Sequence, residues 1–231
     1  MIEVQGLAKY FGRFSALRDL HLDVSDGQFI ALFGRNGAGK TTLLRILAGL
    51  SRPSAGSVWI RGSRPGSLDA RGFTGYLSHN TALYLDLTAL ENLRFYARLL
   101  DLSCADADLE RRISRVGLAG RAREPVRNYS RGMQQRLAIA RAFLHDPAVL
   151  LLDEPFTGLD REGTELLTNH LDEARSHGRT CLMAIHDVPL GYALADRLVV
   201  IEKGGVALDL ARKASTLEEF QRRYRDLTEE C

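Results

Sequence analysis

Cysteine is scarce in this sequence, and long apolar runs are missing from it. The 231 residues include three cysteines, Cys104, Cys181 and Cys231, which are scattered along the chain. Their odd number and wide spacing argue against a disulfide framework and match no metal-binding motif, which favours a reducing compartment. No apolar run approaches the roughly 18 residues that a membrane helix needs, and residues 1–4 do not begin a secretory signal. We therefore expect any work on a membrane to be done through a partner.

An excess of charge of one sign is missing as well. Lysine and arginine total 31, aspartate and glutamate total 29, and the net formal charge is +2. Since the two signs are interspersed, the composition gives no support to nucleic-acid binding, and we expect no nucleic-acid partner. The length fits one large domain, or a core with one insertion, and the sequence shows no internal repeat or low-complexity segment.

Glycine is plentiful by contrast, and one glycine-rich run is the most informative feature. It is Gly34-Arg35-Asn36-Gly37-Ala38-Gly39-Lys40-Thr41, which matches the phosphate-binding pattern G-x-x-x-x-G-K-[ST] at every fixed position. Residues 29–33 before it are typical of a buried strand, and residues 41–48 after it are typical of a helix. Backbone N–H groups of such a loop surround phosphate oxygens, Lys40 adds a point charge, and the Thr41 hydroxyl can ligate Mg²⁺. The alternative is an ordinary glycine-rich turn between a strand and a helix.

Strand-like and helix-like segments alternate through most of the chain, which predicts an α/β fold with a mostly parallel sheet. Strands are expected at 56–60, 73–77, 149–152, 181–185 and 198–201, and helices at 89–100, 108–116, 131–144 and from residues 161 and 189 onward. The middle of the chain, about 80–147, is helical throughout, and we predict a helical insertion there. The charged tail, about 211–231, has few apolar positions and predicts a short helix on the surface.

Two carboxylates follow the apolar strand 148–152. They are Asp153 and Glu154, and the C-terminal edge of a parallel sheet is where open α/β folds bind ligands. A phosphate-bound Mg²⁺ needs a carboxylate beside the loop, which Asp153 can supply through water, and Glu154 is placed to polarise the water that attacks the terminal phosphate. The alternative is a solvated strand end.

With these motifs in order, residues 2–210 resemble the ATP-binding subunit of ATP-binding-cassette (ABC) transporters. That family has a signature stretch, usually Leu-Ser-Gly-Gly-Gln, and the matching residues here are Tyr129-Ser130-Arg131-Gly132-Met133. Ser130 and Gly132 are retained, and the other three positions differ. The Ser130 hydroxyl, the Gly132 amide and the dipole of the following helix converge on one point. The resemblance implies that this point holds the γ-phosphate bound by a second copy, and the alternative is a plain helix cap.

Three further matches follow from the resemblance. Asp160, after Gly158 and Leu159, matches the loop that crosses the dimer interface. His186 after the strand 181–185 matches the switch histidine that contacts the γ-phosphate. Phe11 matches the aromatic side chain that stacks on adenine, with Tyr10 as the weaker candidate, although either ring could instead lie in the core.

The chain departs from the family pattern at two positions that matter for the site. His79 stands where the family usually has a glutamine that contacts the metal, and an imidazole titrates near neutral pH whereas an amide does not. Arg131 replaces a signature glycine, and it either faces the phosphates and favours closure or points to solvent.

The resemblance implies a P-loop NTPase core with an N-terminal antiparallel β-subdomain, all within a single domain of residues 1–231. It implies ATP and Mg²⁺ as cofactors and assigns three sets of residues. Catalytic residues are Lys40, Glu154 and His186; metal-binding residues are Thr41, His79 and Asp153; nucleotide-binding residues are Phe11, Gly34, Arg35, Asn36, Gly37, Ala38, Gly39, Lys40, Thr41, Thr42, His79, Ser130, Arg131, Gly132, Met133 and Asp160.

The expected partners are integral membrane permease subunits and a second copy of the chain, which together sandwich ATP. We expect a peripheral protein on the cytoplasmic face of the inner membrane that powers export. Residues 76–80 and 87–96 are similar to the ATP-binding subunit of the haem exporter of cytochrome c maturation, which also has histidine at the glutamine position. The alternatives are the ATPase of a generic drug, lipid or polysaccharide exporter, a soluble ABC ATPase of DNA repair or translation, and a binding-only subunit.

Overall fold

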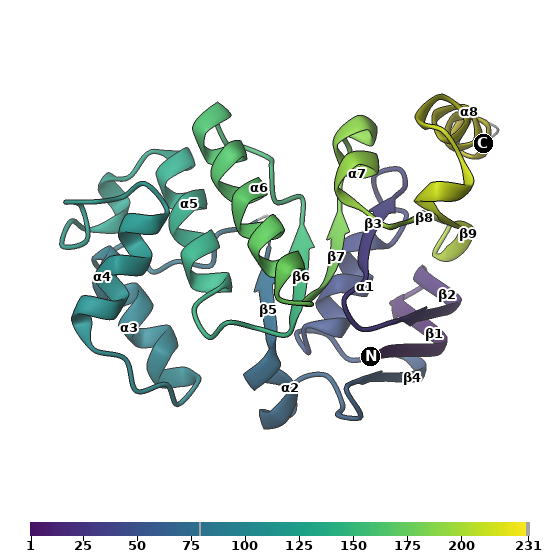
Figure 1. Cartoon of the computed structure of the whole chain (residues 1–231). Helices are drawn as coiled ribbons and strands as arrows, with labels where there is room; N and C mark the ends of the chain where they lie inside the picture. The colour runs from purple at the N-terminus through teal and green to yellow at the C-terminus, as the bar shows by residue number, and fades with distance from the viewer. Residues whose placement is uncertain (79, 230–231) are drawn as a thin grey trace.

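A computed structural model of the chain describes residues 1–78 and 80–229 and contains two β-sheets (Figure 1). The larger sheet has six strands in the order β5-β6-β7-β3-β8-β9, all parallel except β9, which runs antiparallel to β8. The smaller sheet has the order β2-β1-β4 and is antiparallel. The strands are β1 Ile2–Phe11, β2 Phe14–Val24, β3 Phe29–Phe33, β4 Ala55–Ile60, β5 Thr74–Leu77, β6 Val149–Asp153, β7 Thr180–Ala184, β8 Arg197–Glu202 and β9 Gly205–Ala211. The predicted α/β fold is confirmed, including the N-terminal antiparallel sheet.

The helices surround the larger sheet and extend beyond its β5 edge. They are α1 Lys40–Leu47, α2 Leu68–Phe73, α3 Ala89–Leu99, α4 Asp106–Arg115, α5 Arg131–Ala142, α6 Arg161–Ser176, α7 Val188–Leu194 and α8 Leu217–Glu229. In Figure 1, α3, α4 and α5 form a group at the left, whereas α8 lies at the upper right above β8 and β9. None of the helices in residues 1–78 and 80–229 combines the length and the apolar character needed to cross a bilayer.

Alternate side chains of β3 point into two different hydrophobic cores. Phe29, Ala31 and Phe33 belong to a core shared with α3, α4, α5, α6 and α8, whereas Ile30 and Leu32 belong to a core shared with α1 and the smaller sheet. Successive side chains of a strand face opposite sides of the sheet, and a central parallel strand is buried on both. This double burial explains why β3 and most of β6 and β7 are apolar runs in the sequence.

The loop between β5 and α3 is held by a buried asparagine. Asn92 of α3 is fully buried, and its amide group accepts a hydrogen bond from the Tyr84 backbone N–H at 2.8 Å and donates one to the Tyr84 carbonyl at 2.9 Å. At the start of α3, Thr88 and Glu91 form a reciprocal capping box. These contacts fix the direction in which the chain enters the helical group.

Most boundaries lie within a few residues of the expected ones, but three features differ. Helix α2 and strand β9 were not expected. The tail is a helix, as predicted, yet it is not merely a surface helix, because Phe220 of α8 is fully buried and packs on Phe33 with 5.0 Å between ring centroids. A single aromatic residue among charged ones is a weak signal in a sequence. The division into a core and a helical insertion of about 80–147 stays a prediction.

Two partly buried histidines give the fold a pH dependence. Burial is the largest cause that lowers the pKa of both His145 and His170 from the ordinary value of 6.5. The unfolded chain therefore takes up these protons more readily, and the free energy of unfolding should fall as the pH drops below about 6.5. His145→Gln should make this decline shallower, as measured by urea unfolding between pH 5 and 8. An unchanged slope would show that His145 does not contribute.

Candidate functional site

The phosphate loop joins β3 to α1 and depends on glycines for its shape. Gly34 has φ +146°, and a Cβ atom there would lie 2.2 Å from the Ile201 carbonyl oxygen. Gly39 has φ +114°, and a Cβ atom there would lie 2.7 Å from the Ala16 carbonyl oxygen. Gly39 is also the N-cap of α1, so no side chain covers the first amides of that helix. These N–H groups and the positive end of the helix dipole are suited to bind phosphate.

Two alanine substitutions in the loop should differ in cost. A Cβ atom at Gly37 meets no atom within 4 Å, so Gly37→Ala costs only the positive φ of +82°, about 1–3 kcal/mol. Gly34→Ala adds a backbone clash to the conformational cost. We expect Gly34→Ala to lower the free energy of unfolding by clearly more than Gly37→Ala in urea unfolding. Equal losses would contradict the tight approach of β8 to the loop.

Lys40 lies at the start of α1 and is held by the loop itself. Its side-chain ammonium donates to the carbonyl oxygens of Gly34 at 2.6 Å and Arg35 at 3.1 Å, and the residue is 6% exposed. Burial lowers the pKa of Lys40, while the charges of Glu154 and Asp153 act in the opposite direction. The ammonium is thus oriented by carbonyls and balanced by nearby carboxylates.

Asp153 at the end of β6 faces the first turn of α1. Its carboxylate is nearly fully buried and accepts a hydrogen bond from the Thr41 hydroxyl at 2.9 Å. Burial, followed by the charge of Asp153, raises the pKa of Tyr76 from β5, a neighbour that sequence reasoning missed. A hydroxyl and a carboxylate are ligands that Mg²⁺ accepts. In the described part of the chain no three His, Cys, Asp or Glu residues group as a metal site, so phosphate oxygens would have to complete the coordination.

Glu154, the next residue, makes a direct contact with His186. His186 Nε2 and Glu154 Oε1 are 2.7 Å apart, and both side chains are partly exposed. Glu154 has φ +53°, and its backbone N–H donates to the Ala184 carbonyl at 3.0 Å, which fixes it to the end of β7. β6 and β7 are parallel neighbours, so their carboxyl ends bring these two side chains together. The pair can accept and orient a water molecule.

The signature residues lie elsewhere in the same chain. Ser130 is the N-cap of α5, and its hydroxyl accepts a hydrogen bond from the Met133 backbone N–H at 3.2 Å. Figure 1 shows α5 and α1 well apart, with β5 and β6 between them. The structure therefore does not bring residues 130–133, Gly132 included, to the phosphate loop of the same chain.

Arg131 contacts the loop between β6 and α6, and Asp160 is the last residue of that loop. A Cβ atom built at Gly158 would lie 3.1 Å from Arg131 Nε, so the exposed Arg131 side chain runs alongside Gly158. Asp160 is the N-cap of α6, and its carboxylate accepts a hydrogen bond from the Gly163 backbone N–H at 2.8 Å. Within one chain, both residues have local structural roles, and Arg131 presents positive charge beside the α6 start.

The aromatic candidates are exposed rather than buried in the core. Phe11 is 53% exposed and Tyr10 is 51% exposed, which contradicts the alternative of a core position for either ring. The Lys9 ammonium lies 5.0 Å from the centroid of the Phe11 ring. Phe11 pairs with Phe14 across the β1–β2 hairpin.

A hollow beside the loop includes residues that the sequence did not single out. It is lined by Phe14, Ser15, Arg18, Arg35, Asn36, Gly37, Ala38, Glu202 and Lys203. The sequence analysis did not predict five of these residues: Phe14, Ser15, Arg18, Glu202 and Lys203. The available signal was the position of Phe14, three residues after Phe11 and across Gly12, since it places both rings on one hairpin.

Two predicted residues remain to be placed. Thr42 lies in the first turn of α1, and the predicted metal contact His79 lies outside the described residues.

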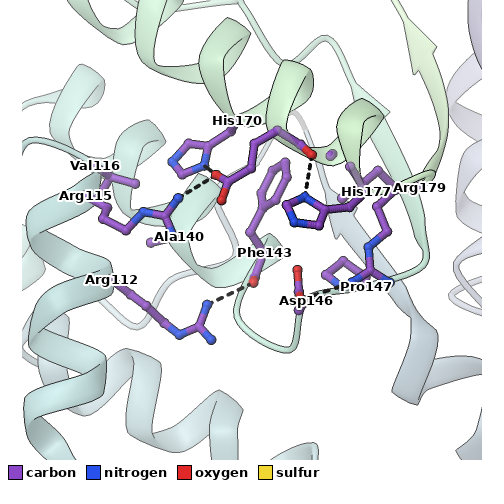
Figure 2. A pocket seen from close by; sticks show the side chains of 13 residues that line it. Arg112, Arg115, Val116, Ala140, Phe143, Asp146, Pro147, His170, His177 and Arg179 are labelled. Carbon is purple, nitrogen blue, oxygen red and sulfur yellow. Dashed lines mark hydrogen bonds and ion pairs between the residues drawn. The ribbon is translucent and has the colours of Figure 1, made fainter.

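A charged pocket between α4 and α6 contains none of the predicted site residues (Figure 2). Its charges are largely paired with one another: Arg115 bonds Glu173 at 2.5 Å, and Arg179 bonds Asp146 at 3.0 Å. Arg112 donates to the Phe143 carbonyl at 3.3 Å. This pocket lies between helices α4, α5 and α6 and is separate from the phosphate loop.

Comparison with known proteins identifies the family. A family model described as "ABC transporter" matches residues 17–157. The chain is 37% identical to an uncharacterized ABC transporter ATP-binding protein, YdbJ, of Bacillus subtilis over 91% of this chain and 69% of that protein. It is 38% identical to the sulfate/thiosulfate import ATP-binding protein CysA 2 of Rhizobium meliloti, over 89% and 58%. It is 40% identical to the aliphatic sulfonates import ATP-binding protein SsuB of Pseudomonas fluorescens, over 90% and 76%.

Solved structures agree with the sequence relatives. An ATP-binding subunit of an ABC transporter matches with a TM-score of 0.86 and 28% identity, over 100% of this chain and 96% of that one. The dimeric ABC transporter cassette MJ0796 matches with a TM-score of 0.82 and 25% identity, over 92% and 99%. The chain spans between 58% and 76% of the length of the three curated relatives named above. It belongs to the ABC transporter family and is an ABC-type ATPase, the subunit type whose ATP hydrolysis is coupled to transport.

Proposed function

We propose that two copies of this chain close on two ATP molecules and use the hydrolysis cycle to move separate membrane permease subunits. The observation that carries this proposal is the meeting of three strand ends at one edge of the sheet. β3 supplies the phosphate loop with Lys40, β6 supplies Asp153 and Glu154, and β7 leads to His186. Charge, metal ligands and a proton acceptor thus converge on the place where a triphosphate would lie.

Each residue has a role that follows from its position. The amides at the start of α1 and the Lys40 ammonium bind phosphate oxygens, and the exposed Phe11 ring is free to stack on adenine. Thr41 and Asp153 would hold Mg²⁺, which would neutralise charge on the phosphates. Glu154 accepts the proton of the attacking water, and His186, 2.7 Å away, orients the Glu154 carboxylate toward that water.

A second copy is needed because, within one chain, the signature residues lie apart from the phosphate loop. Ser130, Arg131 and Gly132 are at the N-terminal end of α5, away from α1 of the same chain. A helix start with a hydroxyl and an arginine is suited to an anion. In a head-to-tail pair, this segment would face the γ-phosphate bound by the partner, with Met133 and Asp160 at the same interface. The dimeric form of MJ0796 supports a pair of this kind.

An apolar groove is the candidate docking site for a permease. It lies where the end of α1, strand β5 and helix α3 meet, and it has a volume of about 440 Å³. Leu50 and Leu99 line it and are 60% and 64% exposed. Exposed leucines around a hollow favour a protein partner over solvent. We propose that a helix of the permease enters this groove between the core and the helical insertion of about 80–147, and holds the chain at the cytoplasmic face of the membrane.

Leu99→Glu tests the groove. The charge should abolish co-purification with membrane proteins, because a carboxylate in a buried apolar contact loses its hydration. Leu68→Glu is the matched control, since Leu68 is 84% exposed on α2 and does not line the groove. The measurement is a tagged pull-down from detergent-solubilised native membranes, with circular dichroism to show that both variants fold. Equal recovery of permease by both variants would refute the docking site.

The comparisons do not support the expectation of haem export. The relatives with assigned substrates, CysA 2 and SsuB, are named for import of sulfate, thiosulfate and aliphatic sulfonates. Their names favour an importer of sulfur oxyanions as the transporter served by this chain, and export as the direction has no support. Mass spectrometry of the same pull-down distinguishes oxyanion import from haem export. An importer-type permease would support oxyanion import, cytochrome-maturation factors would restore haem export, and ribosomes or DNA alone would refute transport.

A further inference from the structure

Helix α8 packs against the strand that leads into the phosphate loop. The ring of Phe220 is fully buried and lies 5.0 Å from the ring of Phe33, the last residue of β3. The ring of Tyr224, one turn later in α8, lies 6.0 Å from the same Phe33 ring. Because Phe33 immediately precedes Gly34, α8 is in contact with the residue from which the loop starts.

Polar contacts extend from α8 to the loop itself. Arg35 donates a hydrogen bond from its guanidinium to the Thr228 backbone carbonyl at 2.9 Å. Burial raises the pKa of the Tyr224 hydroxyl, and an interaction with the backbone of Gly34 lowers that pKa. Two consecutive residues of the loop, Gly34 and Arg35, therefore face α8. Their carbonyl oxygens are the ones that accept hydrogen bonds from Lys40.

The helix supports the loop from behind and leaves its open side clear. In the described part of the chain, none of the residues that line the hollow beside the loop belongs to α8. The helix packs instead on α7 and β8. A segment that holds a binding loop in shape without covering it favours ligand binding, because less ordering remains to be done when the ligand arrives.

We propose that α8 positions the first half of the phosphate loop, so that docking of α8 and binding of nucleotide stabilise each other. Tyr224 and Thr228 act through Gly34 and Arg35 and are positioning residues. Coupling of this kind is reciprocal, so anything that displaces α8 weakens nucleotide binding, and bound nucleotide tightens α8. The inference rests on nucleotide binding at the phosphate loop, which is part of the proposed function.

Amide hydrogen exchange of the wild-type chain with and without MgADP tests the coupling directly. Backbone amides of α8 should exchange at least about threefold more slowly when MgADP is bound, because local opening of α8 then costs part of the binding energy. Helix α4, Asp106–Arg115, lies in the helical group far from α8 and serves as the internal reference (Figure 1). Slower exchange in α8 but not in α4 supports the coupling and excludes a uniform stabilisation by ligand.

Tyr224→Phe tests the positioning role, because it removes the hydroxyl and keeps the ring against Phe33. We expect KM for ATP to rise about threefold to tenfold while kcat stays within about twofold, since the hydroxyl orients the loop and does not touch the reacting atoms. Arg222→Ala, an exposed position on the same helix, is the matched control and should leave KM unchanged. A purely structural Tyr224 would lower the urea midpoint without raising KM.

The outcomes separate this inference from the proposed function. If MgADP binds and exchange in α8 does not change, or if Tyr224→Phe keeps the wild-type KM, the positioning role is refuted while the ATPase assignment stands. If the wild-type chain binds no MgADP, the phosphate-loop assignment is refuted and the coupling with it.

Discussion

Glu154→Gln should slow ATP hydrolysis by roughly 10²-fold or more and leave ATP binding intact. The amide retains the shape of the carboxylate and a hydrogen bond with His186, which lies 2.7 Å away, but it cannot take the proton of the attacking water. Because closure of the pair would then occur without the hydrolysis that reopens it, the variant should accumulate as an ATP-bound dimer. Phosphate release and size-exclusion chromatography with MgATP measure the two effects.

A matched substitution controls for the loss of one negative charge. Glu165→Gln on α6 changes an exposed carboxylate whose partner is Arg161 on the same helix. It should hydrolyse ATP at the wild-type rate and remain monomeric after turnover. Wild-type turnover by Glu154→Gln would remove Glu154 from the catalytic role, and a slow variant that fails to dimerise would refute closure around ATP.

Lys40→Ala should weaken nucleotide binding by roughly tenfold to hundredfold, the range expected for lost charge-assisted hydrogen bonds. The Lys40 ammonium also donates hydrogen bonds to the carbonyls of Gly34 and Arg35, so the variant loses the order of the loop together with the charge. Titration with a fluorescent ATP analogue measures the affinity directly.

Lys40→Met distinguishes charge from packing. Lys40 is buried, and methionine fills much of the space of the lysine stem without the ammonium. We expect Lys40→Met to bind nucleotide as weakly as Lys40→Ala while unfolding at nearly the wild-type urea concentration. Wild-type affinity in Lys40→Met would show that the ammonium is not required and would count against the phosphate-loop assignment.

The fold was predictable where local pattern and tertiary role coincide. β3 is apolar at every position, and β6 is apolar up to its last residue, Asp153, because both faces of a central parallel strand are buried. Such runs are visible in the sequence. β9, Gly205–Ala211, was missed because it is a short edge strand whose side chains are only partly buried. The burial of Phe220 was missed because it depends on Phe33, far away in the chain.

The candidate site was predictable in chemistry more than in arrangement. Asp153 and Glu154 could be placed at a sheet edge from the apolar strand before them. The strand order that brings His186 to Glu154 could not be predicted from any local sequence pattern. The exposure of Phe11 and the position of Phe14 depend on a hairpin whose pairing involves several bulges. The contact proposed for Ser130 lies on a second copy of the chain, so no local pattern in this sequence identifies it.

The alternate burial of β3 side chains limits the changes of length that this chain can accept. Deleting or inserting one residue between Phe29 and Phe33 would send each following side chain to the opposite core and would move Gly34 along the strand axis by roughly 3.3 Å. The same change in the turn between α3 and α4 shifts only partly buried side chains such as Leu102 and leaves the faces of the strands as they are. Insertional scanning should therefore find that single-residue insertions are not tolerated within the strands that end at the nucleotide. It should find that they are tolerated in the turns between the outer helices.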